Sequence, residues 1–438
     1  MSRRLLAAWI VGLGLVVSAP GRAQAQTTTS DLSTLMRTQI LDIWLSRTPD
    51  GQRILIDPPS GDLRTLSPFT LVTQIEQQIG SQLASLPIGS SSGGFTYSYD
   101  AALGTFTRST ESFGPAFAER AATLGKGRFN VGTSYQRSRY THLDGSSLRD
   151  GGITFVLPPG TITSPGFGNV VEAALDLDLK SDTTVFFATA GLASRLDVGI
   201  AVPYQQVTMD LRTRGTIRDF SAFNIAPVSR VFANGTKTQD FLSSGQARGI
   251  GDIVLRGKYK LTRPGLREFA LAVDMRLPTG DKANMLGTGG RETQVMLVSS
   301  YSSSRFDPHF NVGYTFADGV HGSNQINYVA GLEVGATQRL TLIADVIGRN
   351  FLDTLQLRPS AVTIVTPANP ALGIPAFTSA AFATVEPRYG TLKSILGTVG
   401  LKFNPTRSVL VSAHLIASVS DAGLRRRLTP VLGLDYSF

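Results

Sequence analysis

Four histidines are the side chains of this chain with the widest range of possible chemistry. They are His142, His309, His321 and His414. Hydrolysis would need a nucleophile, a histidine and an orienting polar group within hydrogen-bond reach. The first and third histidines lie in expected loops, and the other two lie on expected strands that are not neighbours. Because histidines in a polar interior are more often solvated lining than catalysts, we expect no enzyme and no catalytic residue.

Metal and cofactor sites are not indicated either. No spacing of histidines and acids matches a metal site, and the chain contains no cysteine. The segment HLDGSSLRDGG (142–152) carries the oxygen ligands that a divalent cation prefers, but loops rich in glycine and aspartate are usually turns. No glycine-rich stretch lies between a strand and a helix, which excludes a nucleotide-binding fold. We therefore expect no metal and no cofactor.

The charged side chains alternate with apolar ones, which is typical of a β-strand with two different faces. In residues 249–261 and 268–279, one face is apolar and the other is charged. In a dry core such charges would each cost several kcal/mol unless paired, whereas a wet barrel interior accepts them. The candidate lumen-lining residues are Arg256, Lys258, Asp274, Arg276, His309 and Asp345. The same cluster could equally form interior ion pairs that stiffen a closed barrel.

Twelve alternating segments of this kind follow one another from residue 128 onward. They are 128–140, 176–192, 196–206 with its continuation, 249–261, 268–279, 293–303, 306–316, 325–336, 340–349, 393–403, 408–419 and 427–438. An even number of segments with this length predicts an all-β fold, a transmembrane antiparallel β-barrel of 12 strands. In the third segment the apolar positions change parity after Pro203, which indicates either a β-bulge or a partly apolar lumen.

The connections between these segments alternate between short and long. Short ones include 193–195, 304–305 and 337–339. The long ones are 141–175, 217–248, 281–292, 317–324, 350–392 and 420–426. This asymmetry is typical of outer-membrane barrels, which have tight periplasmic turns and long external loops. A soluble β-sandwich has no reason to alternate its loops in this way.

The N-terminus has the features of a secretory signal. Arg3 and Arg4 precede an apolar run, and Ala23-Gln24-Ala25 forms a cleavage site, so we expect residues 1–25 to be removed on export. Loss of three arginines would lower the net charge from +9 to 9 − 3 = +6. That modest charge does not indicate a nucleic-acid partner. Without cysteine, neither lipid anchoring through that residue nor a disulfide framework is possible.

Residues 26–127 differ from the barrel region at 128–438. Apolar residues recur at helical spacing in SDLSTLMRTQILDIWL (30–45) and SPFTLVTQIEQQIGSQLASLP (67–87), and a hairpin is expected around Ala101–Gly104. The segment could be a plug in the barrel mouth, a periplasmic assembly module or a leader docked on the periplasmic rim. If its hairpin joined the wall, the barrel would have 14 strands.

The last strand carries an apolar face that ends in Tyr436 and Phe438. This ending resembles the terminal signal by which bacterial outer-membrane barrels are recognised for assembly, although any final barrel strand would share the pattern. Either interpretation predicts the bacterial outer membrane, with its lipid and its assembly machinery as partners.

The run GIGDIVLRGKYKL followed by EFALAVDMRLPTGD (249–281) resembles an outer-membrane transporter family named for the meta-pathway of phenol degradation. The likeness extends over 249–438 and more weakly back to 128, and the chain is more loosely similar to the long-chain fatty-acid transporter class. The resemblance implies passive passage of small, often aromatic or apolar organic solutes and supplies no binding residues. The alternative is a non-conducting structural or surface-interaction barrel that works through its long loops, above all the apolar loop 350–392.

Overall fold

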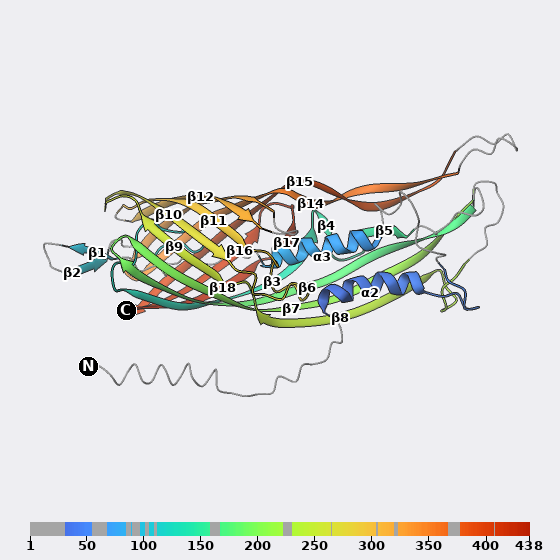
Figure 1. Cartoon of the computed structure of the whole chain (residues 1–438), viewed down its shortest axis with the longest axis horizontal. Coiled ribbons are helices and arrows are strands. Elements are labelled where there is room, and N and C mark those ends of the chain that lie inside the picture. Colours follow the sequence, from blue (N-terminus) through green and yellow to red (C-terminus); the bar gives the residue numbers. More distant parts are fainter. Residues whose placement is uncertain are drawn as a thin grey trace, which may run out of the picture.

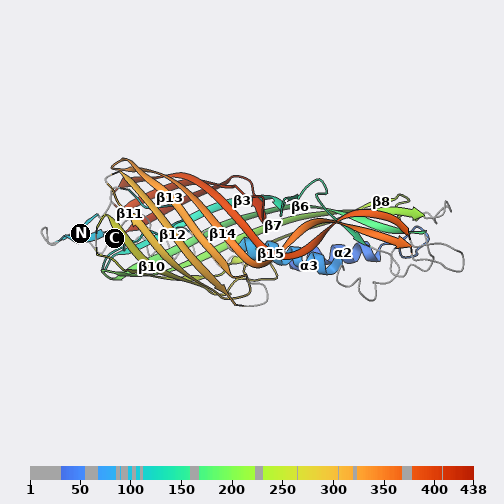
Figure 2. The same ribbon diagram turned by 90° about the horizontal axis from the view of Figure 1, so that it is seen from above.

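The structure is a computed structural model that describes residues 31–54, 68–84, 89, 97–100, 105–108, 112–157, 167–221, 230–263, 265–303, 305–318, 323–366, 377–406 and 408–438. Twelve antiparallel strands form a closed barrel, which confirms the predicted fold (Figures 1 and 2). In wall order they are β3 (Phe129–Leu143), β6 (Phe167–Ala193), β7 (Leu196–Ser221), β9 (Val254–Lys260), β10 (Arg267–Arg276), β11 (Glu292–Tyr301), β12 (Phe306–Ala317), β13 (Gln325–Thr337), β14 (Leu340–Thr366), β15 (Phe377–Thr406), β16 (Val409–Ser418) and β18 (Thr429–Ser437). The last strand pairs with the first, with Tyr436 opposite Val131, and this pairing closes the wall.

The remaining elements lie at the two ends of the barrel. They are α2 (Leu32–Leu45), α3 (Pro68–Ala84), β1 (Tyr97–Asp100), β2 (Thr105–Arg108), β4 (Ser146–Ser147), β5 (Ile153–Leu157), β8 (Thr238–Ile250) and β17 (Leu424–Arg426). Strands β1 and β2 pair only with each other, so the 14-strand alternative is wrong. Their hairpin lies beyond the barrel end that carries the C-terminus, while both helices lie at the opposite end (Figure 1). The expected turn at Ala101–Gly104 and the signal segment 1–25 lie outside the described residues.

The wall has an apolar outer face and a polar inner face, as the alternation predicts. Exposed outer residues include Leu255, Tyr259, Phe269, Leu271, Leu297, Phe310, Leu342, Val399, Leu415 and Leu432. Inner residues such as Lys258, Asp307, Glu333 and Lys402 are buried. These inner charges lie inside a crowded lumen, where each needs a partner.

Three regions that the sequence indicated as loops contain strand instead, which corrects the expected bounds at 141–175, 217–248 and 350–392. Strand β6 begins at Phe167, β8 occupies much of the second region, and β14 pairs with β15 as far as Thr366 and Phe377. Together with β5, the outer parts of β6, β7, β14 and β15 and all of β8 form what we call the extension, a continuation of the sheet beyond the barrel (Figure 2).

Strand β7 shows why the extension was missed. Its inner positions change from polar to apolar after Pro203, and Val207, Met209 and Leu211 are buried. The pairing of β6 with β7 continues without a register shift through Pro203. A bulge is therefore not the cause of the parity change, and the partly apolar interior is the correct alternative. The inner face of this part of the sheet is apolar because it packs against the two helices. The outer face carries charged pairs such as Arg212 with Asp240.

The helices supply the apolar core of the extension. Asp31 caps the N-terminus of α2, where its side chain accepts a hydrogen bond from the backbone N–H of Thr34 at 2.7 Å. One core joins the helices to the sheet and includes Met36, Ile40, Ile43, Ile75, Ile79, Leu83, Leu177, Leu179, Met209, Leu211, Leu357 and Val385. Arg37 on α2 pairs with Glu76 on α3 at 2.8 Å. Neither described helix is long and apolar enough to cross a bilayer.

Candidate functional site in the barrel lumen

Residues 112–124, which we call the lumen segment, lie inside the barrel near the end that carries the C-terminus. Three hydrogen bonds fix the backbone of this segment to different parts of the wall. The N–H of Phe113 donates to Thr341 Oγ1 at 3.1 Å, and that of Ala121 donates to Ser300 Oγ at 3.0 Å. The N–H of Leu124 donates to Asp197 Oδ2 at 3.0 Å. The segment therefore spans the lumen from one side to the other.

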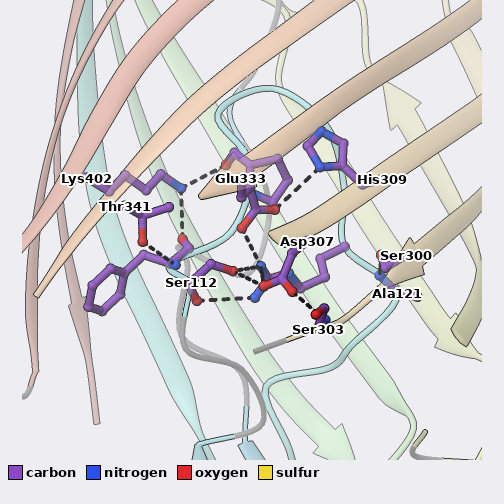
Figure 3. Close-up of polar contacts among 12 residues, drawn as sticks. Ser112, Ala121, Ser300, Ser303, Asp307, His309, Glu333, Thr341 and Lys402 are labelled. Atoms are coloured by element: carbon purple, nitrogen blue, oxygen red, sulfur yellow. Dashed lines mark hydrogen bonds and ion pairs between the residues drawn. The ribbon is translucent and has the colours of Figure 1, made fainter. Parts of the chain in front are cut away.

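One set of charges surrounds Arg120, a buried residue of the lumen segment. Its guanidinium contacts Glu333 on β13 and Asp307 on β12, the latter at 3.4 Å (Figure 3). His309 extends this network, with its Nε2 at 2.9 Å from Asp345 and its Nδ1 at 3.4 Å from Glu333. Because one arginine contacts carboxylates on two neighbouring strands, the network ties the segment to the wall.

A second set of charges surrounds Glu119. Arg256 makes a two-point contact with Asp274 at 2.7 and 2.6 Å, and its NH1 donates to Glu119 at 2.8 Å. The ammonium of Lys258 lies 3.3 Å from Glu119 and 3.8 Å from Asp197. A planar guanidinium that contacts two carboxylates in this way is geometrically well fixed.

The six candidate lining residues therefore fall into three groups. Arg256, Lys258 and Asp274 lie around Glu119, while His309 and Asp345 lie in the Arg120 network. Arg276 stands apart, because it pairs with Glu292 at 3.2 Å and donates to the carbonyl of Ala84 at the end of α3 at 2.5 Å. Within the described residues, no group of three or more histidines and acids could hold a metal ion.

Sequence reasoning missed Glu119 and Arg120, although a signal was present. The two opposite charges interrupt a run of small and apolar residues, FGPAFAERAATLG (113–125). Both side chains are buried, and their partners are as many as 213 positions away in the chain. Adjacent charges in an otherwise apolar run are a reason to look for buried partners elsewhere.

A cavity of about 110 Å³ lies in the lumen beside the lumen segment. One part of its lining is charged and includes Arg276, Glu292 and Arg349, from strands β10, β11 and β14. Another part is apolar and aromatic and includes Phe117 and Tyr328. The volume corresponds to roughly four water molecules, so the cavity admits one small molecule at a time.

The segment RLPTGD (276–281) has a structural role where the wall meets the extension. The buried carboxylate of Asp252, between β8 and β9, accepts hydrogen bonds from the N–H of Gly280 at 3.0 Å and from the N–H and hydroxyl of Thr288 at 2.8 and 2.9 Å. A Cβ at Gly287 would lie 2.5 Å from the same carboxylate, so the close approach requires glycine there. The loop also anchors α2, because the carbonyl of Ala283 accepts from the N–H of Ser33 at 3.1 Å.

The C-terminal aromatic residues lie on the outer face at the closure of the barrel. Phe438 and Phe129 exchange two backbone hydrogen bonds, at 2.9 and 3.0 Å, and their rings stack with centroids 5.6 Å apart. Tyr436 is exposed next to them on the same face. These contacts join the last residue of the chain to the first barrel strand.

The sequence of this chain matches one family model, and its fold is similar to several solved structures. A family model described as "Putative MetA-pathway of phenol degradation" matches residues 159–345. The chain has no match among curated proteins. Similar solved structures include the COG4313 outer membrane channel from Pseudomonas putida F1 (12% identity, 72% of this chain and 97% of that chain, TM-score 0.40). A second is a FadL homologue from Pseudomonas aeruginosa, with 10% identity over 71% of this chain and 90% of that chain and a TM-score of 0.32. A third is the toluene transporter TbuX from Ralstonia pickettii, with 12% identity over 72% of this chain and 90% of that chain and a TM-score of 0.26.

At these sequence identities and TM-scores, none of the three similarities is evidence for a substrate of this protein. The family match is more informative, because it extends from β6 through β13 into the start of β14 and so contains both Asp252 and the segment RLPTGD. The resemblance to the family named for the meta-pathway of phenol degradation is therefore confirmed over this part of the chain.

Proposed function

We propose that this protein is an outer-membrane channel for the passive passage of small organic molecules, including aromatic and apolar ones. The observation that carries the proposal is the closed 12-strand wall, which is apolar outside and polar inside and encloses a cavity. A barrel of this kind satisfies its backbone hydrogen bonds without water, which is what a bilayer requires.

The short turns and the C-terminus give the barrel its proposed orientation. They lie at the end that faces the periplasm in outer-membrane barrels, so the extension and both helices face the outside of a Gram-negative cell (Figure 1). Export would follow cleavage of the signal at residues 1–25, and the exposed Tyr436 and Phe438 would be read by the assembly machinery.

In this proposal the region 26–127 acts as a plug and not as a periplasmic module. The lumen segment narrows the route at the periplasmic end, and α3 contacts the rim at the outer end, where the side chain of Gln82 accepts from the N–H of Leu424 at 2.6 Å. Solutes would have to pass beside the segment, through the space around the cavity. Passage is then restricted to small molecules.

A non-conducting barrel is the second candidate, and the ion pairs of the lumen segment favour it. Arg120 and Glu119 tie that segment to three strands, β13, β12 and β9, through Glu333, Asp307, Arg256 and Lys258. A lumen filled permanently in this way would leave the extension to act as an interaction surface. The two candidates differ in whether any solute crosses.

Solute uptake by liposomes that contain the refolded protein tests the proposal. Heat-modifiability on a gel first shows that the barrel has folded. The panel compares phenol and benzoate with glucose, sucrose and salts. We expect faster passage of the small organic solutes than of sucrose. Rates equal to those of protein-free liposomes for every solute would reject the channel and favour the non-conducting barrel.

A further inference from the structure

Asn311 is a buried polar side chain of the lumen that takes no part in the ion-pair networks described above. It lies on the inner face of β12, is 1% exposed and lines the cavity beside the lumen segment. Neither the oxygen nor the nitrogen of its amide has a hydrogen-bond partner among the described residues. Buried amide groups are normally hydrogen-bonded, and each unpaired atom is unfavourable. The amide can therefore bond a molecule that enters the cavity.

The immediate surroundings of Asn311 are apolar. It lies opposite Val298 on β11 and opposite Val329 on β13, and both valines are buried. Val298 packs with Met296 in one apolar cluster, and Val329 packs with Ile347 in another. Met296, Val329 and Ile347 also line the cavity. A single polar group between apolar side chains is typical of small-molecule sites, where it orients a ligand whose body is apolar.

Five charged groups of the cavity lining already have partners, which favours a neutral ligand. Arg256 pairs with Glu119 and Asp274, and Arg276 pairs with Glu292. A charged ligand would have to compete with these pairs, and breaking one of them leaves a buried charge without compensation. A neutral molecule leaves all of these pairs intact.

A second carboxamide is the group that best complements the amide of Asn311. Its N–H donates to Oδ1 while its C=O accepts from Nδ2, so one ligand group satisfies both unpaired atoms. A ketone only accepts and leaves Oδ1 without a donor. The volume of about 110 Å³ limits the rest of the ligand to a few carbon atoms, since a cavity of roughly 150 Å³ takes up benzene.

We propose that Asn311 binds the carboxamide of a small neutral organic molecule whose apolar body lies against Val329 and Ile347. This inference rests on the proposed channel function and names a substrate class for it, short-chain amides. The two hydrogen bonds replace those that the amide makes with water before it enters, so the molecule reaches the apolar part of the lumen without losing its hydrogen bonds.

A ligand-observed NMR titration of the folded full-length protein in detergent micelles tests the site, with protein-free micelles as the background. Isobutyramide is compared with methyl isopropyl ketone, which has the same shape but a methyl group in place of the amide nitrogen. We expect the amide to bind roughly tenfold more tightly, because the ketone leaves the side-chain oxygen of Asn311 unpaired. We also expect nuclear Overhauser effects between the methyl groups of the amide and those of Val329 and Ile347.

Asn311→Leu, a nearly isosteric change to an apolar side chain, should abolish the preference for the amide. The matched control is Asn327→Leu. Asn327 also lines the cavity, but its Nδ2 already donates to Thr315 Oγ1 at 2.7 Å. This control should leave the ratio of the two affinities unchanged. Heat-modifiability shows whether each variant has folded, and the comparison of the two ligands in the unaltered protein needs no variant.

Equal affinities of the two ligands for the unaltered protein would overturn the site, as would a preference for the amide that persists in Asn311→Leu. Binding of neither ligand above the micelle background would show that water alone satisfies the side chain, which also overturns it. The titration does not depend on passage. Isobutyramide that binds but does not cross liposomes would therefore reject the channel and leave the site standing, whereas passage without binding would reject the site and leave the channel standing.

Discussion

Glu119→Gln is the substitution that should loosen the lumen segment most selectively. The carboxylate of Glu119 holds both Arg256 at 2.8 Å and Lys258 at 3.3 Å. In the variant Arg256 keeps Asp274. Lys258, which is 1% exposed, keeps only the more distant Asp197 at 3.8 Å as an ion-pair partner among the described residues. Removing one partner of a buried ion pair costs about 3–5 kcal/mol of stability. Because glutamine retains one acceptor oxygen, we expect the attached state of the segment to lose about 3 kcal/mol, the lower end of this range. Because about 1.4 kcal/mol is a factor of ten, the detached state should become roughly 100-fold more populated.

The absence of cysteine from the chain makes this change measurable. A single cysteine at Ala118, a buried position of the lumen segment, would react with a water-soluble maleimide only when the segment detaches. We expect the labelling rate of the folded protein in micelles to rise roughly 100-fold in the Glu119→Gln background, in proportion to the detached population.

Glu386→Gln is the matched control for this experiment. It removes a carboxylate that pairs with Arg388 on the extension, far from the lumen segment, and should leave the labelling rate unchanged. An unchanged rate in Glu119→Gln itself, with the barrel still heat-modifiable, would refute the reasoning, because the segment would then be held by contacts other than these ion pairs.

Four further predictions concern the loop, the wall, the extension and the orientation. Asp252→Asn should lower the free energy of unfolding by about 2–3 kcal/mol in urea titrations, since three hydrogen bonds to a buried carboxylate are weakened; no loss would show that the loop is held without it. Gly348→Ala should cost about 1–3 kcal/mol in the same titration, because its Cβ would lie 2.0 Å from the ring of Tyr328, whereas Gly390→Ala, at 3.3 Å from Gln356, should be milder. Hydrogen bonds from Arg214 and Arg212 hold the pKa of Asp240 on the extension below its usual range, so the stability that this carboxylate contributes is present above the unfolded pKa of about 4 and is lost as the pH falls. Asp240→Asn should therefore remove this acid dependence from the hydrogen-exchange protection factors of β7 and β8. An unchanged dependence in the variant would contradict the prediction. A cysteine at the exposed Asp50 should be labelled on intact cells and one at the exposed Arg339 only after permeabilisation, and the reverse pattern would invert the proposed orientation.

The barrel could be predicted from the sequence because its signal is local. Alternation on segments such as 268–279 sets which side chains face outward, and burial agrees with that pattern for Phe269, Leu271 and Glu268. The short turns then fix antiparallel neighbours. Each of these inferences needs only residues that are close together in the chain.

The extension and the lumen segment could not be predicted in the same way. On β7 the alternation continues beyond Pro203, but its polar face is now outside, and the sequence alone could not distinguish this change from a β-bulge. The contacts of Arg120 with Asp307 and Glu333 join residues 187 and 213 positions apart, and no periodicity encodes such a pairing.

Recording single channels in planar bilayers tests the central claim most directly. The full-length folded protein is inserted into the bilayer, and the conductance of single insertion events is measured. The account predicts small, discrete conductance steps, because the lumen segment narrows the route. Insertion of folded protein without any conductance step would contradict the channel.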